Sequence, residues 1–240
     1  MGAAAARLRR RGREVRRVRR DCGPGAVAFM VARRALRLVG VRVEWIRILE
    51  QRPGTAAVPG RDPIPPTWVA PDDPGVLTAF GRSPDVVRRR LDAGGRAAVV
   101  TDADGLVAQL WIHPGAEYDE EGVRFRLAPD EAWVFDGVVS ESRRGERIYP
   151  RLAVGVAHDL EADGVARLLS TIDALNVPSL RAARVRGCTV LGAVLVVRAW
   201  GLGALRVHWR GRPARWHAFR GSILLTPPPS PRATAPARTA

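Results

Sequence analysis

A polar turn between an apolar strand and an apolar helix is the segment of this chain best suited to chemistry. Residues 132–139 are rich in aromatic and β-branched side chains, which is typical of a buried strand, and they lead into the polar residues 140–145. From Tyr149, apolar residues recur at three- and four-residue spacing until Asp163, which predicts a helix. The first N–H groups of a helix lack partners within it and attract anions. The turn is therefore a candidate phosphate site.

The residues of the turn and the segment after the helix strengthen this interpretation. Arg144 offers a planar cation that suits phosphate oxygens, and Gly145 lets the backbone approach a ligand closely. A second apolar strand is predicted over residues 166–172. It ends at Asp173, and Asn176 then precedes another predicted helix.

This order of elements resembles the GCN5-related N-acetyltransferase (GNAT) superfamily, in which a strand leads into Arg/Gln-x-x-Gly-x-Gly/Ala and a helix start that holds the acetyl-CoA pyrophosphate. The matching segment is 144–149, and Asn176 with Ser179 resembles the family's Asn-x-x-Ser/Ala helix. The resemblance implies acetyl-CoA as co-substrate. The residues that it implies for binding are Val138, Val139, Arg144, Gly145, Glu146, Arg147, Ile148, Tyr149, Asn176 and Ser179.

Three positions depart from the family pattern. Arg147 stands where the family has its inner Gly, and Tyr149 stands where Gly or Ala is usual. Many members place a general-acid Tyr seven residues after the Asn, and here that position is Ala183. The alternative to an enzyme is therefore a GNAT-like relative that no longer catalyses and serves as an interaction or regulatory module.

Acyl transfer from a thioester to an amine requires three groups: a base for the amine, a donor for the thioester carbonyl and an acid for the thiolate. The resemblance implies the backbone N–H groups of Val138 and Val139 for the carbonyl. Tyr149 is the nearby phenol that can protonate the thiolate, although a packing role fits its position equally well. The candidate bases are Glu141, Asp173 and Asp136, and water is the alternative to all three.

The remaining patterns predict further elements of one domain. A first strand is expected over 42–49, a helix after Ser83, a hairpin around residues 102–105 and a last hairpin around residues 201–203. The predicted fold class is α/β (α+β), with a GNAT-like mixed, mostly antiparallel central sheet of about six to seven strands flanked by helices. We expect this acyltransferase domain to span residues 38–226.

The ends of the chain are basic, and every basic residue is Arg. We expect residues 1–37 to form a largely solvated basic arm and the start of an amphipathic helix, and residues 227–240 to form a disordered Pro-rich tail. Nucleic acid or an anionic membrane surface is a less favoured partner for these ends. Arg and aromatic residues also interleave over 206–217, where terminal strands of a twisted sheet are the simpler interpretation.

Cysteine and histidine usage gives no sign of a metal centre. Cys22 and Cys188 cannot form a disulfide framework, and the four His residues lack metal-ligand spacing. A reducing cytoplasm fits this composition. The sequence thus predicts a cytoplasmic N-acetyltransferase whose acceptor is an amine of a small molecule or sugar. Neither the acceptor nor the oligomeric state can be inferred from the residues.

Overall fold

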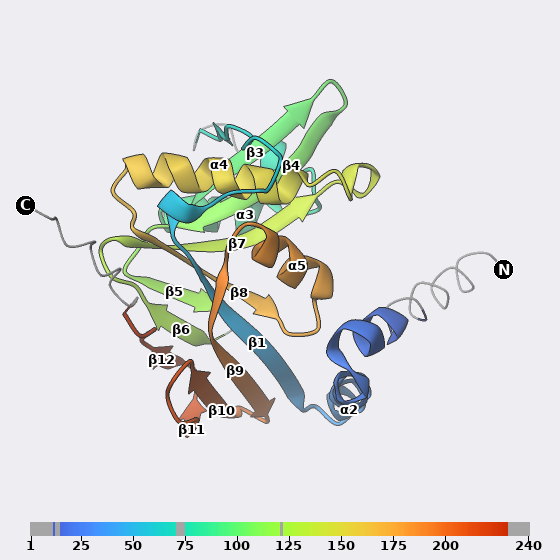
Figure 1. The fold of residues 1–240 in the computed structure, drawn as a ribbon. Helices are drawn as coiled ribbons and strands as arrows, with labels where there is room; N and C mark the ends of the chain where they lie inside the picture. Colours follow the sequence, from blue (N-terminus) through green and yellow to red (C-terminus); the bar gives the residue numbers. More distant parts are fainter. Residues whose placement is uncertain (1–11, 13–14, 71–74, 121, 230–240) are drawn as a thin grey trace, which may run out of the picture.

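The computed structural model describes residues 12, 15–70, 75–120 and 122–229, and it is built on a nine-stranded sheet (Figure 1). The strand order is β11-β10-β9-β1-β8-β7-β4-β3-β2. Its strands are β1 (Arg42–Gln51), β2 (Thr67–Trp68), β3 (Arg96–Asp102), β4 (Gly105–His113), β7 (Glu131–Val139), β8 (Arg167–Asp173), β9 (Thr189–Ala199), β10 (Leu202–Trp209) and β11 (Arg215–Arg220). All neighbours are antiparallel except β7 and β8.

The predicted fold class is confirmed, and the sheet is larger than expected. The short β2 and the Arg-rich β11 extend its two edges beyond the six to seven strands that the sequence predicts. The interleaved Arg and aromatic residues at 206–217 indeed lie mainly in terminal strands. A second, three-stranded sheet joins β5 (Glu117–Glu120), β6 (Val123–Arg126) and β12 (Ile223–Leu225).

The helices are α2 (Pro24–Leu38), α3 (Pro84–Asp92), α4 (Ile148–Ala162) and α5 (Val177–Val185). Helix α4 and the small sheet cover opposite faces of the large sheet, and α3 lies on the same face as the small sheet. Leu152 and Val156 of α4 pack with Leu110 of β4, and all three belong to the largest core cluster. On the other face, Phe125 of the small sheet stacks on Trp133 of β7 at a centroid distance of 4.5 Å. The central part of β7 is thus buried from both sides.

Residues 15–22 of the N-terminal arm are helical and mostly exposed, with one side chain buried. Val18 is that buried residue, and it is only 2% exposed. Asp21 accepts a hydrogen bond from Arg181 of α5 at 2.6 Å. The arm's first eleven residues and most of the predicted tail lie outside the described residues. No helix in the described part of the chain is long and apolar enough to cross a membrane.

Candidate active site

The turn between β7 and α4 forms as the sequence predicts. A short 3-10 turn, Glu141–Arg143, follows the strand, and Gly145 then adopts a φ of 100°. Arg147 is the N-cap residue of α4 and lies in the left-handed region, with φ 59° and ψ 25°. In a helix that begins at Ile148, the N–H groups of residues 147–149 have no acceptor within the helix. They form the anion-attracting end of α4.

Arg147 is the cation of this turn that stays uncommitted. Arg144 donates to Glu141 at 2.9 Å, and both side chains are exposed. Arg143 donates to Glu146 at 2.9 Å and also contacts Asp102. Arg147 is exposed and forms no ion pair with the residues that the structure describes. An incoming phosphate would therefore meet Arg147 without displacing a carboxylate.

β7 and β8 separate toward the turn. Their parallel pairing covers only Glu131, Ala132 and Trp133 on β7, and beyond it the strands diverge toward α5 (Figure 1). The N–H of Ser140 donates to Val107 on the β4 side at 2.8 Å. Because successive N–H groups of a strand point to opposite edges, the N–H of Val139 is directed into the gap and that of Val138 toward β4. Of the two predicted donors, Val139 has the better orientation.

The Tyr149 side chain of α4 packs against a bulge in β7. Asp136 has a φ of 47°, and β7 carries one extra residue opposite β4 at this point. Gly137 then presents bare backbone to the Tyr149 ring, because a Cβ there would lie 2.1 Å from the Cε2 atom of Tyr149. The ring thus occupies the edge of β7 just before the predicted phosphate turn.

A buried cation that the sequence did not predict lies behind Tyr149. The Arg186 guanidinium is 5.2 Å from the centre of the Tyr149 ring, and Arg186 is only 2% exposed. Its carbonyl accepts from Gln51 Nε2 at 3.3 Å, and the Cys188 thiol donates to Gln51 Oε1 at 3.4 Å. Burial raises the pKa of the Cys188 thiol, and Arg186 only partly opposes that shift. The sequence does not indicate this cluster, because Gln51 lies on β1, Tyr149 on α4, and Arg186 and Cys188 between α5 and β9.

The three candidate bases are all engaged with cations. Asp173 accepts from Arg33 of α2 at 2.6 Å and from the N–H of Leu175 at 2.8 Å. Asp136 lies between Arg82 and Arg90, with Arg90 Nη1 at 2.5 Å. The side chain of Glu141 is 74% exposed and paired with Arg144. None of them is held as a free carboxylate.

The remaining predicted residues are placed by α5. Asn176 is the N-cap of this helix, and its Oδ1 accepts from the N–H of Ser179 at 3.3 Å. Ala183, at the position of the family's Tyr, is fully buried. The amide of Asn176 therefore has its N–H₂ group left to offer a ligand, because the cap uses the oxygen.

A hollow of about 450 Å³ opens near β7 on the face away from α4. Aromatic and charged side chains line it together: His113, Glu117, Tyr118, Asp119, Phe135, Arg89 and Arg90 are among them. Burial raises the pKa of Tyr118, and the charge of Glu120 adds to the shift, so its phenol stays protonated. The hollow lies between β5 and α3, and no local sequence pattern indicates it.

No family model and no curated protein matches the chain. Among solved structures, it is similar to a protein from Novosphingobium aromaticivorans named for the GNAT acetyltransferase family, at 19% identity and a TM-score of 0.48, over 66% of each chain. A GNAT-family acetyltransferase from Colwellia psychrerythraea matches at 14% identity and a TM-score of 0.49, over 68% of this chain and 59% of that one.

A GCN5-related N-acetyltransferase from Sphaerobacter thermophilus matches at 18% identity and a TM-score of 0.41, over 81% of this chain and 58% of that one. The chain thus spans less than two thirds of the length of these structures. They carry the name of the superfamily that residues 131–188 resemble. At these identities and TM-scores, the likeness is one of partial architecture and assigns no role to a residue of this chain.

Proposed function

We propose that this protein is an acyl-CoA-dependent N-acyltransferase that transfers acetyl from acetyl-CoA to an amine of a small molecule or sugar. The observation that carries the proposal is the gap between β7 and β8, which leads to the open N-terminus of α4 beside the uncommitted Arg147. A long ligand with a thioester at one end and phosphates at the other fits this sequence of donors.

Each part of acetyl-CoA has a proposed partner. The pyrophosphate lies against the first N–H groups of α4, and Arg147 adds a charged hydrogen bond. The thioester carbonyl accepts from the N–H of Val139, where negative charge develops as the amine attacks. Tyr149 protonates the departing thiolate, and the Asn176 amide donates to the pantetheine arm.

The engaged carboxylates shape the proposed proton transfer. Asp173 is the candidate base nearest the end of β8, but its carboxylate already accepts a hydrogen bond from Arg33 at 2.6 Å. An amine with a low pKa would need little help, since water can take its proton once the carbonyl is attacked. This favours an acceptor that is largely neutral at physiological pH.

A second candidate function is a non-catalytic GNAT-like module, and one observation favours it. The Tyr149 ring covers the backbone of Gly137, where a thioester would have to pass close to β7. If this ring does not move, CoA can bind only by its nucleotide end. Such a protein would bind CoA without transferring its acetyl group.

Acetyl-CoA binding is the first test. Ligand at about 100 times its dissociation constant should stabilise the fold by about 2.7 kcal/mol, which thermal denaturation would detect. CoA without the acetyl group is the matched control. A folded protein whose melting temperature does not change at millimolar acetyl-CoA would rule out both candidate functions.

Thiol release separates the two candidates. The enzyme should release free CoA in the presence of an amine panel, and Tyr149→Phe should lower that rate while leaving acetyl-CoA affinity nearly unchanged. The Phe variant keeps the ring on Gly137, so packing alone would not change the rate. Binding without any amine-dependent thiol release would favour the non-catalytic module.

A further inference from the structure

One end of the large sheet carries two arginines directly opposite each other. Arg42 of β1 and Arg198 of β9 are paired in the antiparallel register. Side chains at such positions start about 5 Å apart, and like charges there repel. The carboxylate of Glu44 lies 4.0 Å from Arg198 Nη1, which is too far for a hydrogen bond. An anion between the two guanidinium groups would relieve the repulsion.

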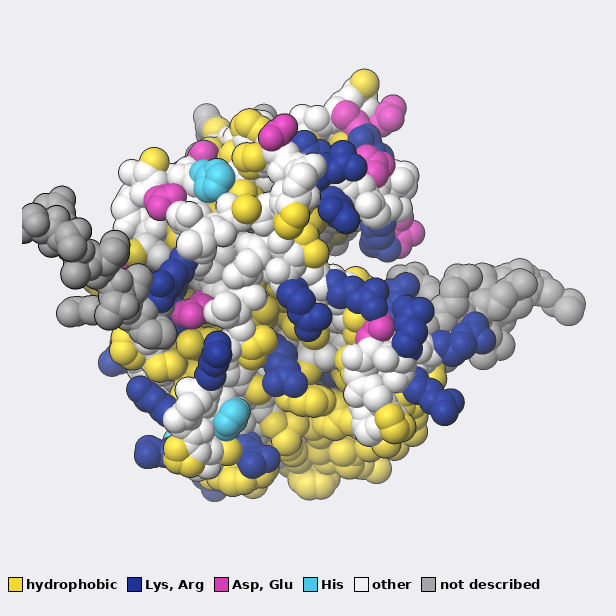
Figure 2. All heavy atoms as spheres, viewed as in Figure 1, with side chains coloured by type: hydrophobic (Ala, Val, Ile, Leu, Met, Phe, Trp, Pro, Cys, Tyr) yellow, Lys and Arg dark blue, Asp and Glu magenta, His cyan; other side chains and the backbone are white. Residues whose placement is uncertain are grey.

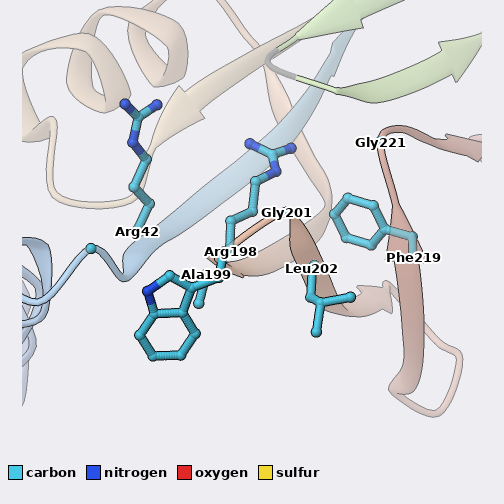
Figure 3. A pocket seen from close by; sticks show the side chains of 10 residues that line it. Arg42, Arg198, Ala199, Gly201, Leu202, Phe219 and Gly221 are labelled. Atoms are coloured by element: carbon cyan, nitrogen blue, oxygen red, sulfur yellow. The ribbon is translucent and has the colours of Figure 1, made fainter.

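The positions opposite Arg198 on the next two strands, β10 and β11, are apolar. Gly203 lies opposite Arg198, and Phe219 lies opposite Gly203. Because Gly203 has no side chain, the Phe219 ring lies over it, and the Arg198 guanidinium is 5.6 Å from the ring centre. Arg198 Nη2 is buried and has no hydrogen-bond partner. Figure 3 shows Arg42 and Arg198 extending side by side at a hollow of about 310 Å³.

A strained turn presents a tryptophan at this hollow. Trp200 and Gly201 form the two-residue connection between β9 and β10, with φ values of 49° and 79°. Both values are positive, as in a type I′ turn, where Asn and Gly are preferred and a bulky residue is an outlier. Nevertheless Trp200 is present, and it is 82% exposed. Strain of this kind is retained where the exposed side chain has a use.

The end of α2 adds aliphatic side chains to the same surface. Leu38 is 87% exposed and Val39 61% exposed, and both precede Gly40, which lies next to the Trp200 indole. α2 contains no acidic residue and has a basic residue, Arg37, in its last turn. Figure 2 shows hydrophobic side chains gathered over α2 and the adjoining ends of β1 and β9, with basic side chains at their edge.

We propose that this surface, the Arg–Trp tip, docks onto an anionic lipid bilayer. We define the tip by Leu38, Val39, Arg42, Arg198, Trp200 and Leu202. Arg42 and Arg198 would bind lipid phosphate oxygens, for which paired guanidinium groups are well suited. The indole of Trp200 favours the interface between headgroups and acyl chains. Leu38, Val39 and Leu202 would enter the acyl boundary.

The aliphatic residues favour a bilayer over a nucleic acid. A single strand could stack a base on Trp200 and pair its phosphates with arginine. It would leave the exposed side chains of Leu38 and Val39 in water, because bases offer no hydrocarbon phase to aliphatic groups. A bilayer removes both from water together with Leu202.

Vesicle flotation with the full chain tests the proposal. The protein should float with phosphatidylcholine vesicles that contain phosphatidylglycerol, should not float with pure phosphatidylcholine, and should dissociate as salt rises. Arg42→Glu should weaken vesicle binding roughly ten-fold or more. Trp200→Gly should also weaken it, and this variant relieves the turn strain, so loss of folding cannot explain a loss of binding.

Two variants outside the tip are the controls. Trp216→Ala removes another exposed tryptophan, which lies on the face of β11 opposite to Phe219. Arg88→Glu reverses a charge on α3. Both should bind vesicles like the parent. The proposal would be overturned by equal binding to neutral vesicles, by full binding of Arg42→Glu and Trp200→Gly, or by tighter binding to single-stranded DNA through the same residues. Absence of vesicle binding would also overturn it.

Discussion

Arg147 adopts a left-handed backbone conformation that usually favours glycine. Its φ of 59° lies in the left-handed region, which a glycine adopts at little cost and other residues adopt at about 1 kcal/mol or more. The GNAT motif has Gly at the matching position. This chain has Arg there in a left-handed conformation, and the Arg side chain is exposed beside the helix N-terminus.

Arg147→Gly separates binding from stability. Loss of the left-handed strain and the greater entropy of an unfolded glycine nearly offset each other, so the unfolding free energy should change by less than about 1 kcal/mol. Acetyl-CoA affinity, measured by calorimetry, should fall roughly ten-fold or more, because a charged hydrogen bond to phosphate is lost. Tighter binding by the variant would mean that Arg147 obstructs the site, and it would favour the non-catalytic module.

Cys188 should react slowly with thiol reagents at neutral pH. Burial raises its pKa above the ordinary value, so the protonated thiol persists where an exposed cysteine begins to ionise. In a Cys22→Ser variant, labelling by a disulfide reagent should be slow near pH 8 and should accelerate as pH rises toward the raised pKa. The control is Cys188→Ser, which leaves the exposed Cys22. Equal rates for the two variants would contradict the expected burial.

At the scale of elements, local patterns predicted the site region closely. The helix expected from Tyr149 to residue 163 begins at Ile148 and ends at Ala162, and the strand expected over 166–172 covers Arg167–Asp173. These elements are long and strongly periodic, so their signal is local. The residues expected to bind acetyl-CoA remain predictions, since geometry alone does not test them.

Other features of the site depend on contacts that no local pattern encodes. No motif or periodicity indicated that Tyr149 would lie on Gly137 or that Asp136 would pair with two arginines. Nor did it indicate the second sheet, whose β12 pairs with β6 about one hundred residues earlier in the chain. Such pairings follow from packing and burial across the whole sequence, which periodicity does not report.

Gly137→Ala tests the contact between β7 and α4. The new Cβ would overlap the Tyr149 ring, so one element must shift, and we expect a loss of about 1–3 kcal/mol in unfolding free energy. Gly137→Ala combined with Tyr149→Ala should recover part of that loss. Gly25→Ala in α2 is the control, since its Cβ meets nothing within 4 Å and should be neutral or stabilising. Equal effects of the two glycine changes would argue against the contact.

At the scale of the whole molecule, a buried ion triad joins three strands at the other end of the gap. Arg167 of β8 donates to Glu50 of β1 at 2.9 Å and to Glu131 of β7 at 2.6 Å. Arg167 is only 4% exposed. The parallel pairing of β7 and β8 begins at this residue and ends two residues later. The triad thus fixes the point from which the two strands diverge toward the proposed acetyl-CoA site.

Arg167→Met should be among the most damaging single changes in the described core. It leaves the buried Glu131 and the partly buried Glu50 without their cation, which typically costs about 3–5 kcal/mol. Urea denaturation should show this loss, whereas Arg96→Met should cost less, about 1–2 kcal/mol, because it breaks an exposed pair with Asp163 and a contact between the guanidinium and the Trp68 ring. If Arg167→Met instead matches Arg96→Met in stability, the triad is not what holds β1, β7 and β8 together. The divergence of β7 and β8 would then depend on packing against α4 and the small sheet alone.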